Sequence, residues 1–236
     1  ESALRRGKKT ANAVWGNQAS VLVGDFLFSR SFELMVEDGS LDVLRILSGA
    51  SSIIAEGEVL QLTTAGNLAT TESQYLDAIA AKTAALFAAA CEISAVIKGS
   101  PEAHQKALYT YGEALGIAFQ IADDVLDYSA HQATLGKTIG DDFREGKMTL
   151  PIIHAYQHGT SDEKAFWTRT IEAQKQQDGD LEAALAIMAK YGSLDFAMQQ
   201  ARAYGDKAIE ALSAFPDNAA KSALEGIITF SIERAY

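Results

Sequence analysis

The apolar residues of this chain are spaced as in α-helices over almost its whole length. They recur at intervals of three and four residues, and no segment sustains the apolar–polar alternation that marks a β-strand. Proline, which breaks helices, occurs only three times among the 236 residues. No repeat or linker interrupts the pattern. The sequence therefore predicts an all-α fold, a bundle of long, mostly antiparallel helices that forms a single domain over residues 1–236.

Capping residues place several of the helix boundaries. Thr71 and Gln74 form a capping box, so a helix is expected from there to Lys98. Ser100 and Pro101 suit the N-cap and first turn of the following helix, which is expected to reach residue 128. Further helices are expected at about residues 16–37, 40–64, 162–176, 180–191, 193–213 and 218–234, with another beginning at 149–151.

Composition narrows the range of partners and compartments. The net charge of −11 argues against a general nucleic-acid binder, which needs a basic surface. The most apolar window, residues 79–97, is interrupted by Lys82 and Glu92, so no transmembrane segment is expected. Cys91 is the single cysteine, which favours a reducing compartment, and no signal peptide is recognisable. These features predict a cytoplasmic protein.

Three aspartates in an apolar segment, Asp123, Asp124 and Asp127, are the most informative residues of the chain. Their spacing places them on one side of a helix. Like charges so close together destabilise a helix, and burying them among apolar neighbours is costly unless cations bind. Mg2+ prefers oxygen ligands and typically combines one or two carboxylates with waters and substrate phosphates. The alternative is a solvated acidic patch, which a single DDxxD motif does not exclude.

Neighbouring basic residues favour a magnesium-bridged phosphate site. Lys137 and Lys147 follow the aspartates in a glycine-rich stretch and could bind phosphate oxygens directly. Arg5 and Arg6 could clamp a diphosphate bidentately, although a solvated terminus is the alternative. Lys82 lies in an apolar helix, where a lysine needs either a path to solvent or an anionic partner.

An ordered set of short motifs resembles the polyprenyl (trans-isoprenyl) diphosphate synthases, and the similarity covers essentially the whole chain. The motifs are Arg5-Arg6-Gly7-Lys8, Glu56-Gly57-Glu58, Gln61-Leu62, Lys82-Thr83, Phe119-Gln120, Asp123-Asp124-Val125-Leu126-Asp127, Gly136-Lys137, Gly140-Asp141-Asp142 and Glu145-Gly146-Lys147. The run from Asn12 to Leu27 most resembles bacterial members that make octaprenyl diphosphate.

The resemblance implies a homodimeric all-α enzyme whose helices surround a deep central cavity. It implies Mg2+-dependent head-to-tail condensation of isopentenyl diphosphate with an allylic diphosphate. In the family, metals bound by two aspartate-rich motifs draw diphosphate from the allylic substrate. The isopentenyl double bond attacks the resulting carbocation, and a proton is then lost. Metal ions and cationic side chains suit the charge of the leaving group, and an apolar cavity keeps water from the cation.

The resemblance also implies roles for single residues. Asp123, Asp124 and Asp127 would form the second aspartate-rich motif and bind metal, while Asp123, Asp124, Lys82 and Lys137 would be the catalytic residues. The residues expected to bind substrate lie around the diphosphates or the isoprenoid: Arg5, Arg6, Lys82, Thr83, Phe119, Gln120, Lys137 and Lys147. Among these, Arg5, Lys82 and Lys137 would contact the allylic diphosphate. Arg6 would contact isopentenyl diphosphate, and Phe119 would face the isoprenoid.

The sequence departs from the family's pattern at the first aspartate-rich motif. This motif would end just before Glu1 and is absent from this sequence. We therefore expect this chain to be a fragment that is inactive alone, with an enzyme as its parent. A non-catalytic subunit of a heteromeric prenyl synthase is an alternative. The intact second motif argues against it, because a subunit without activity would not need to keep these aspartates. A terpene cyclase-like enzyme is another alternative, and the cations for two diphosphates argue against it. A plain helical scaffold would not need acidic residues inside an apolar helix.

The expected product is a long chain of the octaprenyl type, serving as a quinone side chain. The helix after Gly16 is expected to line the cavity, and its small residues Ala19, Ser20, Val23 and Gly24 would leave room for such a chain. Close helix packing is the alternative explanation for these small residues. A shorter farnesyl or geranylgeranyl product is the alternative for the reaction.

Overall fold

The computed structural model describes residues 4–5, 8–129 and 139–233, and these residues form the predicted helical bundle. Its helices are α1 (Ala11–Asp38), α2 (Leu41–Thr64), α3 (Glu72–Ile79), the π-helical turn η1 (Ala80–Ala84), α4 (Ala85–Ile97), α5 (Glu102–Leu126), α7 (Asp141–Arg144), α8 (Leu150–His158), α9 (Ser161–Trp167), the π-helical turn η2 (Thr168–Glu172), α10 (Asp180–Lys190), α11 (Ser193–Ala211), the 3-10 turn η3 (Leu212–Ala214) and α12 (Ala219–Glu233). The all-α prediction is confirmed. The sequence did not predict the short antiparallel pair of β1 (Leu4–Arg5) and β2 (Lys8–Lys9).

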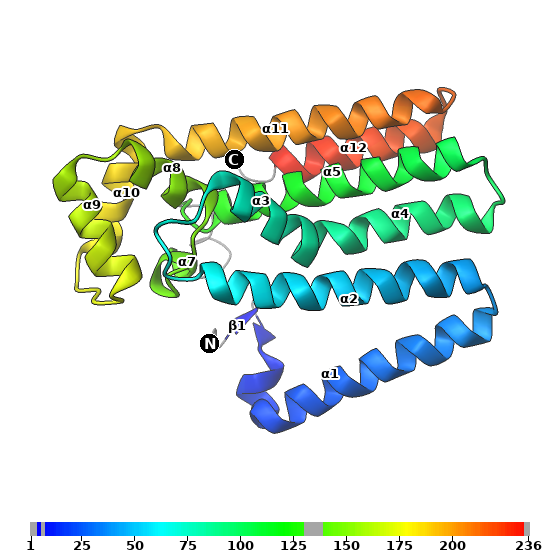
Figure 1. The fold of residues 1–236 in the computed structure, drawn as a ribbon, viewed down its shortest axis with the longest axis horizontal. Coiled ribbons are helices and arrows are strands. Elements are labelled where there is room, and N and C mark those ends of the chain that lie inside the picture. The colour runs from blue at the N-terminus through cyan, green and yellow to red at the C-terminus, as the bar shows by residue number, and fades with distance from the viewer. Residues whose placement is uncertain (1–3, 6–7, 130–138, 234–236) are drawn as a thin grey trace.

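Helix α5 lies at the centre of the bundle. It packs against α4 on one side and against α11 and α12 on another, while α2 covers α4 and η1 (Figure 1). Small residues on α5 allow its neighbours to pack closely. At Gly112, for example, a Cβ would lie 2.4 Å from the carbonyl oxygen of Phe87, so only glycine fits there. Ala114, Ala118 and Ile121 are completely buried. Figure 1 shows α1 splayed away from the other long helices, and its apolar side chains are largely exposed.

Several predicted boundaries are confirmed, and two are corrected. Thr71 and Gln74 form the expected capping box at the start of α3. At α5 the cap residue is Pro101 and it provides no side-chain hydrogen bond, so the prediction that Ser100 is the N-cap was wrong. Helix α1 starts at Ala11, earlier than expected, because the Thr10 side chain caps it. Gly16 then interrupts α1 with a non-helical φ of 81°.

The helix predicted from Thr71 to Lys98 contains an unpredicted π-helical turn, η1. Two glycines on neighbouring helices approach its backbone closely. A Cβ at Gly57 of α2 would lie 2.6 Å from the Lys82 nitrogen, and a Cβ at Gly116 of α5 would lie 2.6 Å from Cα of Ala84. Turns of this kind are rare and often occur at functional sites.

The segment Glu72–Ile97 is long and apolar enough, by length and composition alone, to cross a membrane. Core helices of soluble proteins pass the same test. In this structure the segment lies between α2 and α5 and carries Lys82 near its middle.

Candidate active site

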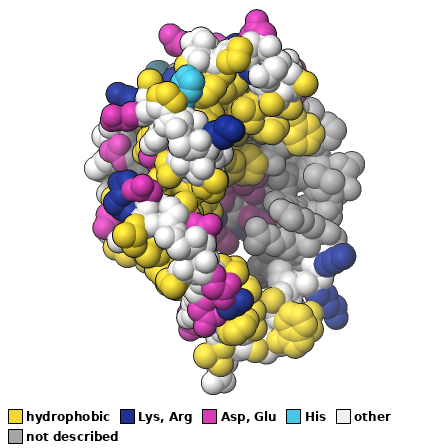
Figure 2. Space-filling view, turned by 90° about the vertical axis from the view of Figure 1, so that its right-hand side faces the viewer, with side chains coloured by type: hydrophobic (Ala, Val, Ile, Leu, Met, Phe, Trp, Pro, Cys, Tyr) yellow, Lys and Arg dark blue, Asp and Glu magenta, His cyan; other side chains and the backbone are white. Residues whose placement is uncertain are grey.

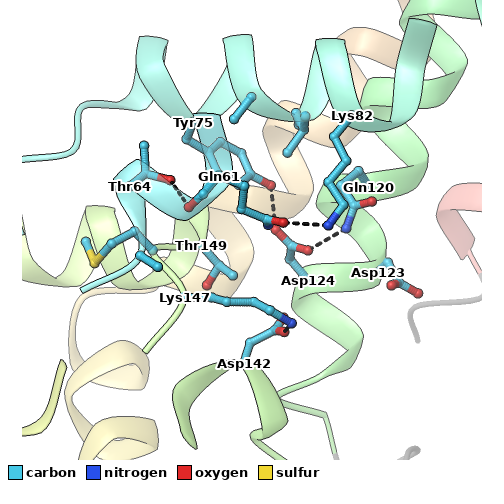
Figure 3. Close-up of a pocket in the computed structure, with 14 residues that line it drawn as sticks. Gln61, Thr64, Tyr75, Lys82, Gln120, Asp123, Asp124, Asp142, Lys147 and Thr149 are labelled. Atoms are coloured by element: carbon cyan, nitrogen blue, oxygen red, sulfur yellow. Dashed lines mark hydrogen bonds and ion pairs between the residues drawn. The ribbon is translucent and has the colours of Figure 1, made fainter. Parts of the chain in front are cut away.

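A cavity of about 480 Å3 lies where α2, α3, η1 and α5 meet the segment that follows α7 (Figure 3). The residues that line it are Gln61, Thr64, Ala65, Tyr75, Ala78, Ile79, Lys82, Gln120, Asp123, Asp124, Asp142, Lys147, Met148 and Thr149. A view onto one end of the molecule shows a hollow with acidic side chains deep inside it and apolar side chains along its wall (Figure 2). Acidic and basic groups thus share one concave site, as a metal–phosphate site requires.

A chain of hydrogen bonds holds Asp124 in the wall of this cavity. The Tyr75 hydroxyl donates to Oδ2 of Asp124 at 2.7 Å, and the side-chain amide of Gln120 donates to Oδ1 at 2.8 Å. The Thr83 hydroxyl donates to the Gln120 amide oxygen at 2.9 Å. Each carboxylate oxygen of Asp124 therefore receives a hydrogen bond from a different helical segment.

Two of the aspartates have raised pKa values. Burial raises the pKa of Asp124 from 3.8 to about 7, and the charge of Asp142 adds to the effect, although the bonds from Tyr75 and Gln120 oppose it. Burial and the charge of Asp142 likewise raise the pKa of Asp127 to about 6, against the hydrogen bond that it accepts from the Asp142 backbone. Without a cation, these carboxylates are held where their charged forms are disfavoured.

Lys147 enters the cavity from the segment after α7 and is paired with two carboxylates. Its ammonium group lies 2.7 Å from Asp142 and 2.7 Å from Glu145. Partial burial lowers the pKa of Lys147, but the hydrogen bonds to Asp142 and Glu145 raise it overall. Lys147 is therefore a permanent positive charge at the edge of the aspartate cluster.

Lys82 faces the cavity from the π-helical turn η1. Its ammonium group donates a hydrogen bond to the side-chain oxygen of Gln61 and lies 3.2 Å from the carboxylate of Glu58. Both partners come from α2. Of the two alternatives for this lysine, a path to solvent or an anionic partner, the structure shows an anionic partner, Glu58. Figure 3 shows Lys82 and Lys147 reaching into the cavity from two sides of Asp124.

The structure brings together five of the predicted site residues, since Lys82, Gln120, Asp123, Asp124 and Lys147 line one cavity. Thr83 joins them through Gln120.

The remaining predicted residues are not among those that line this cavity, and the roles of all the predicted site residues stay predictions. Asp127 does not line it, but it accepts a hydrogen bond from the backbone of Asp142 at 3.0 Å. Phe119 is half-buried and packs against Phe87, with ring centroids 5.5 Å apart. Arg6 and Lys137 lie outside the described residues.

Two further expectations concern the N-terminal part of the chain. Of Arg5, only the backbone in β1 is described. The cavity-lining residues include none from α1, all of which is described, so the expected lining by Ala19, Ser20, Val23 and Gly24 is not seen in this cavity.

The structure adds five polar residues to the site that the sequence did not single out: Gln61, Thr64, Tyr75, Asp142 and Thr149. Asp142 and Gln61 belong to motifs that resembled the family, but no role was predicted for either. Tyr75 and Thr149 carried no signal for the site, because their contacts with Asp124 and with Tyr128 join residues far apart in the chain. Proximity to the aspartates becomes visible only once the helices are packed.

The side chains around the cavity fit a hard divalent cation. Among the residues that the structure describes, no three His, Cys, Asp or Glu side chains converge closely enough to hold a metal by themselves. Mg2+ commonly keeps several waters and uses one or two carboxylates together with substrate phosphates. Asp123 and Asp124 supply such oxygens. A cation bound beside Asp124 would favour its charged form and so lower its raised pKa.

Known proteins match this chain over nearly its full length. The octaprenyl diphosphate synthase of Escherichia coli (strain K12) is 47% identical over 234 residues, which are 99% of this chain and 72% of that protein. The crystal structure of a decaprenyl diphosphate synthase from Rhodobacter capsulatus is similar with a TM-score of 0.94 and 52% identity, covering 100% of this chain and 72% of that one.

A second similar structure was solved with bound ligands. It is a polyprenyl synthase from Caulobacter crescentus CB15 complexed with calcium and isoprenyl diphosphate, with a TM-score of 0.95, 49% identity and coverage of 100% of this chain and 72% of that one. The family described as polyprenyl synthetase matches residues 1–188. On these grounds, and with the aspartate and lysine residues gathered in one cavity, the chain belongs to the polyprenyl synthetase family.

Proposed function

We propose that this trans-prenyltransferase makes a long polyprenyl diphosphate of the octaprenyl type, by head-to-tail condensation of isopentenyl diphosphate with an allylic diphosphate. The observation that carries the proposal is the cavity that Asp123 and Asp124 line together with the cations Lys82 and Lys147. The octaprenyl diphosphate synthase of E. coli, at 47% identity, supports the product length. The product would serve as a quinone side chain.

The side chains around the cavity suit the departure of diphosphate from an allylic carbon. Bound Mg2+ would neutralise charge on the leaving diphosphate and would be held by Asp123, Asp124 and Asp127. Lys82 and Lys147 would exchange their present carboxylate partners for phosphate oxygens. After the isopentenyl double bond has attacked the allylic cation, the new carbocation would lose a proton to the released diphosphate. The reaction therefore needs no side-chain base.

The predicted contacts of the other residues complete the proposal. Arg5 and Lys137 would bind the allylic diphosphate, and Arg6 would bind isopentenyl diphosphate. Gln120 and Thr83 would line the diphosphate site, joined by their hydrogen bond of 2.9 Å. Phe119, packed against Phe87, would face the isoprenoid.

The alternatives have less support. A non-catalytic subunit would not need to keep Lys82, Lys147 and two aspartates in one cavity. A shorter product would agree with relatives of lower identity, such as the geranylgeranyl diphosphate synthase of Saccharolobus solfataricus at 35% identity.

We also propose that the protein is a cytoplasmic homodimer. Exposed apolar side chains along α1, among them Val21, Leu22 and Phe26, support a partner surface there. The position of Glu72–Ile97 between α2 and α5 supports a soluble enzyme. Sedimentation velocity of the full-length protein should give the mass of two chains, and the mass of one chain would contradict the dimer.

Product analysis tests the reaction. The full-length protein would be incubated with Mg2+, farnesyl diphosphate and isotopically labelled isopentenyl diphosphate, and the dephosphorylated products would be separated by chromatography. We expect a product of eight isoprene units, and omission of Mg2+ should abolish it. A farnesyl- or geranylgeranyl-sized product would refute the chain length, and no condensation at all would refute the proposed function.

A further inference from the structure

Tyr75 is a buried tyrosine whose hydroxyl is directed at a carboxylate of the candidate metal site. It lies on α3, is 5% exposed and donates a hydrogen bond of 2.7 Å to Oδ2 of Asp124. We propose that Tyr75 is a positioning residue, which holds the Asp124 carboxylate in the orientation that binds Mg2+ and diphosphate. This inference rests on the proposed function, because it concerns the same site.

The position of Tyr75 is itself closely determined. The capping box of Thr71 and Gln74 starts α3 immediately before it, and the Tyr75 amide donates to the Thr71 carbonyl oxygen at 3.0 Å. Its ring is part of the buried core. A side chain fixed in this way presents its hydroxyl at one place, so the hydrogen bond constrains Asp124 more than it constrains Tyr75.

Asp124 needs such a constraint because a carboxylate can rotate about its terminal bond. Gln120 holds only Oδ1, at 2.8 Å, and Gln120 is in turn oriented by Thr83. With Tyr75 on Oδ2, both oxygens are fixed from opposite sides. Each oxygen still has a lone pair available, since an ionised carboxylate accepts about four hydrogen bonds or equivalent contacts.

The effect of Tyr75 on Oδ2 depends on its hydroxyl alone, which lies 2.7 Å from that oxygen. Residues that orient metal ligands in this way typically change metal affinity or activity by roughly 10- to 100-fold when they are removed.

The replacement Tyr75→Phe tests the inference, because it removes one oxygen atom and leaves the buried ring. Tyr111→Phe is the matched control. Tyr111 is also buried, at 1% exposure, and donates to the Leu224 carbonyl oxygen at 3.0 Å. It lies thirteen residues before Asp124 on α5, a distance of about 20 Å along the helix axis.

Two measurements on the full-length protein and both variants separate positioning from general stability. The first is the rise in thermal midpoint on adding Mg2+ with inorganic diphosphate, which needs no turnover. The second is the Mg2+ concentration at half-maximal prenyl transfer. For Tyr75→Phe we expect a smaller thermal rise and a half-saturating Mg2+ concentration about 10-fold higher. For Tyr111→Phe we expect both values to match the unmodified protein.

The outcomes distinguish this inference from the proposed function. If Tyr75→Phe shows the same thermal rise and Mg2+ dependence as the unmodified protein, Tyr75 does not position Asp124. Equal changes in both variants would also overturn the inference, because they would show a purely structural effect. If the unmodified protein is stabilised by Mg2+ and diphosphate but transfers no prenyl group, the proposed function fails, while the thermal comparison still decides the role of Tyr75.

Discussion

Asp124 is subject to two conflicting requirements, which show why this residue suits a cation site. The residue is 6% exposed, so a permanent charge there is costly. Binding a cation nevertheless requires the carboxylate to be ionised. Burial, and then the charge of Asp142, raise its pKa to about 7, so below about pH 7 the metal-free protein keeps a proton there that Mg2+ would displace.

This conflict predicts a specific dependence of stability on pH. Between about pH 4 and pH 7 the folded state keeps a proton on Asp124 that the unfolded state has released, so stability falls as the pH rises through this range. Asp124→Asn removes this contribution. We expect the free energy of unfolding of the metal-free variant, measured by urea denaturation, to decline less steeply than that of the unmodified protein.

Asp127, whose pKa is raised to about 6 mainly by burial, contributes a similar slope in both proteins. The comparison therefore isolates Asp124. Identical slopes over this range would show that Asp124 is ionised in the folded protein without metal, contrary to its environment.

At the scale of the helices, the π-helical turn η1 carries Lys82 to the cavity that Asp123 and Asp124 also line. The turn is packed between Gly57 of α2 and Gly116 of α5, each close to its backbone. Only glycine allows these approaches, since any Cβ would lie under 3 Å from a main-chain atom of η1.

The close approach at Gly57 predicts the effect of Gly57→Ala. The new methyl group would meet the Lys82 backbone nitrogen at 2.6 Å and the carbonyl carbon of Ala81 at 2.9 Å. We expect a loss of stability of about 1–3 kcal/mol, as in other overpacked cores. Prenyl transfer should also fall, because η1 and Lys82 must shift. Urea denaturation and the product assay measure the two effects.

Gly49→Ala on the same helix is the control for this substitution. Gly49 is exposed, and a Cβ there meets nothing within 4 Å. Alanine should therefore stabilise α2 by roughly 0.5–1 kcal/mol, since glycine disfavours helix interiors. If Gly57→Ala were as stable and active as Gly49→Ala, the contact between α2 and η1 would not determine the position of Lys82.

Local sequence signals predicted the helices but not the irregular turns within them. The capping box at Thr71 and the break after Lys98 depend on neighbouring residues, and both were predicted correctly. The π-helical turn at Ala80–Ala84 depends on contacts with Gly57 and Gly116, which lie more than twenty residues away. The same distinction holds for the site: the aspartates were recognisable, whereas Tyr75 was not.

At the scale of the whole molecule, distant parts of the chain support the cavity together. Gln176 follows the π-helical turn η2, yet its side-chain amide donates to the carbonyl oxygens of Phe143 at 2.8 Å and Thr170 at 3.1 Å. Phe143 belongs to α7, next to Asp142 of the cavity. The C-terminal part of the chain thereby supports the segment that carries Asp142 and Lys147. The prediction that residues 1–236 form one domain stays a prediction, and this link is consistent with it.

This long-range support can be tested with Gln176→Ala. Loss of the amide would leave two carbonyl oxygens without this donor, so we expect destabilisation by roughly 1–3 kcal/mol. Gln177→Ala, at the exposed neighbouring position, should change stability by less than about 0.5 kcal/mol. Thermal or urea unfolding of both variants provides the comparison. Equal stabilities would mean that Gln176 does not support α7.

The central claim is that the aspartates of α5 hold the metal that the prenyl transfer needs, and Asp124→Ala in the full-length protein tests it most directly. Diphosphate release would be measured with Mg2+, isopentenyl diphosphate and an allylic diphosphate, with Gly49→Ala as the control. We expect Asp124→Ala to lower turnover by roughly 100-fold or more, while the folded control retains it. Near-normal turnover by Asp124→Ala would contradict the account.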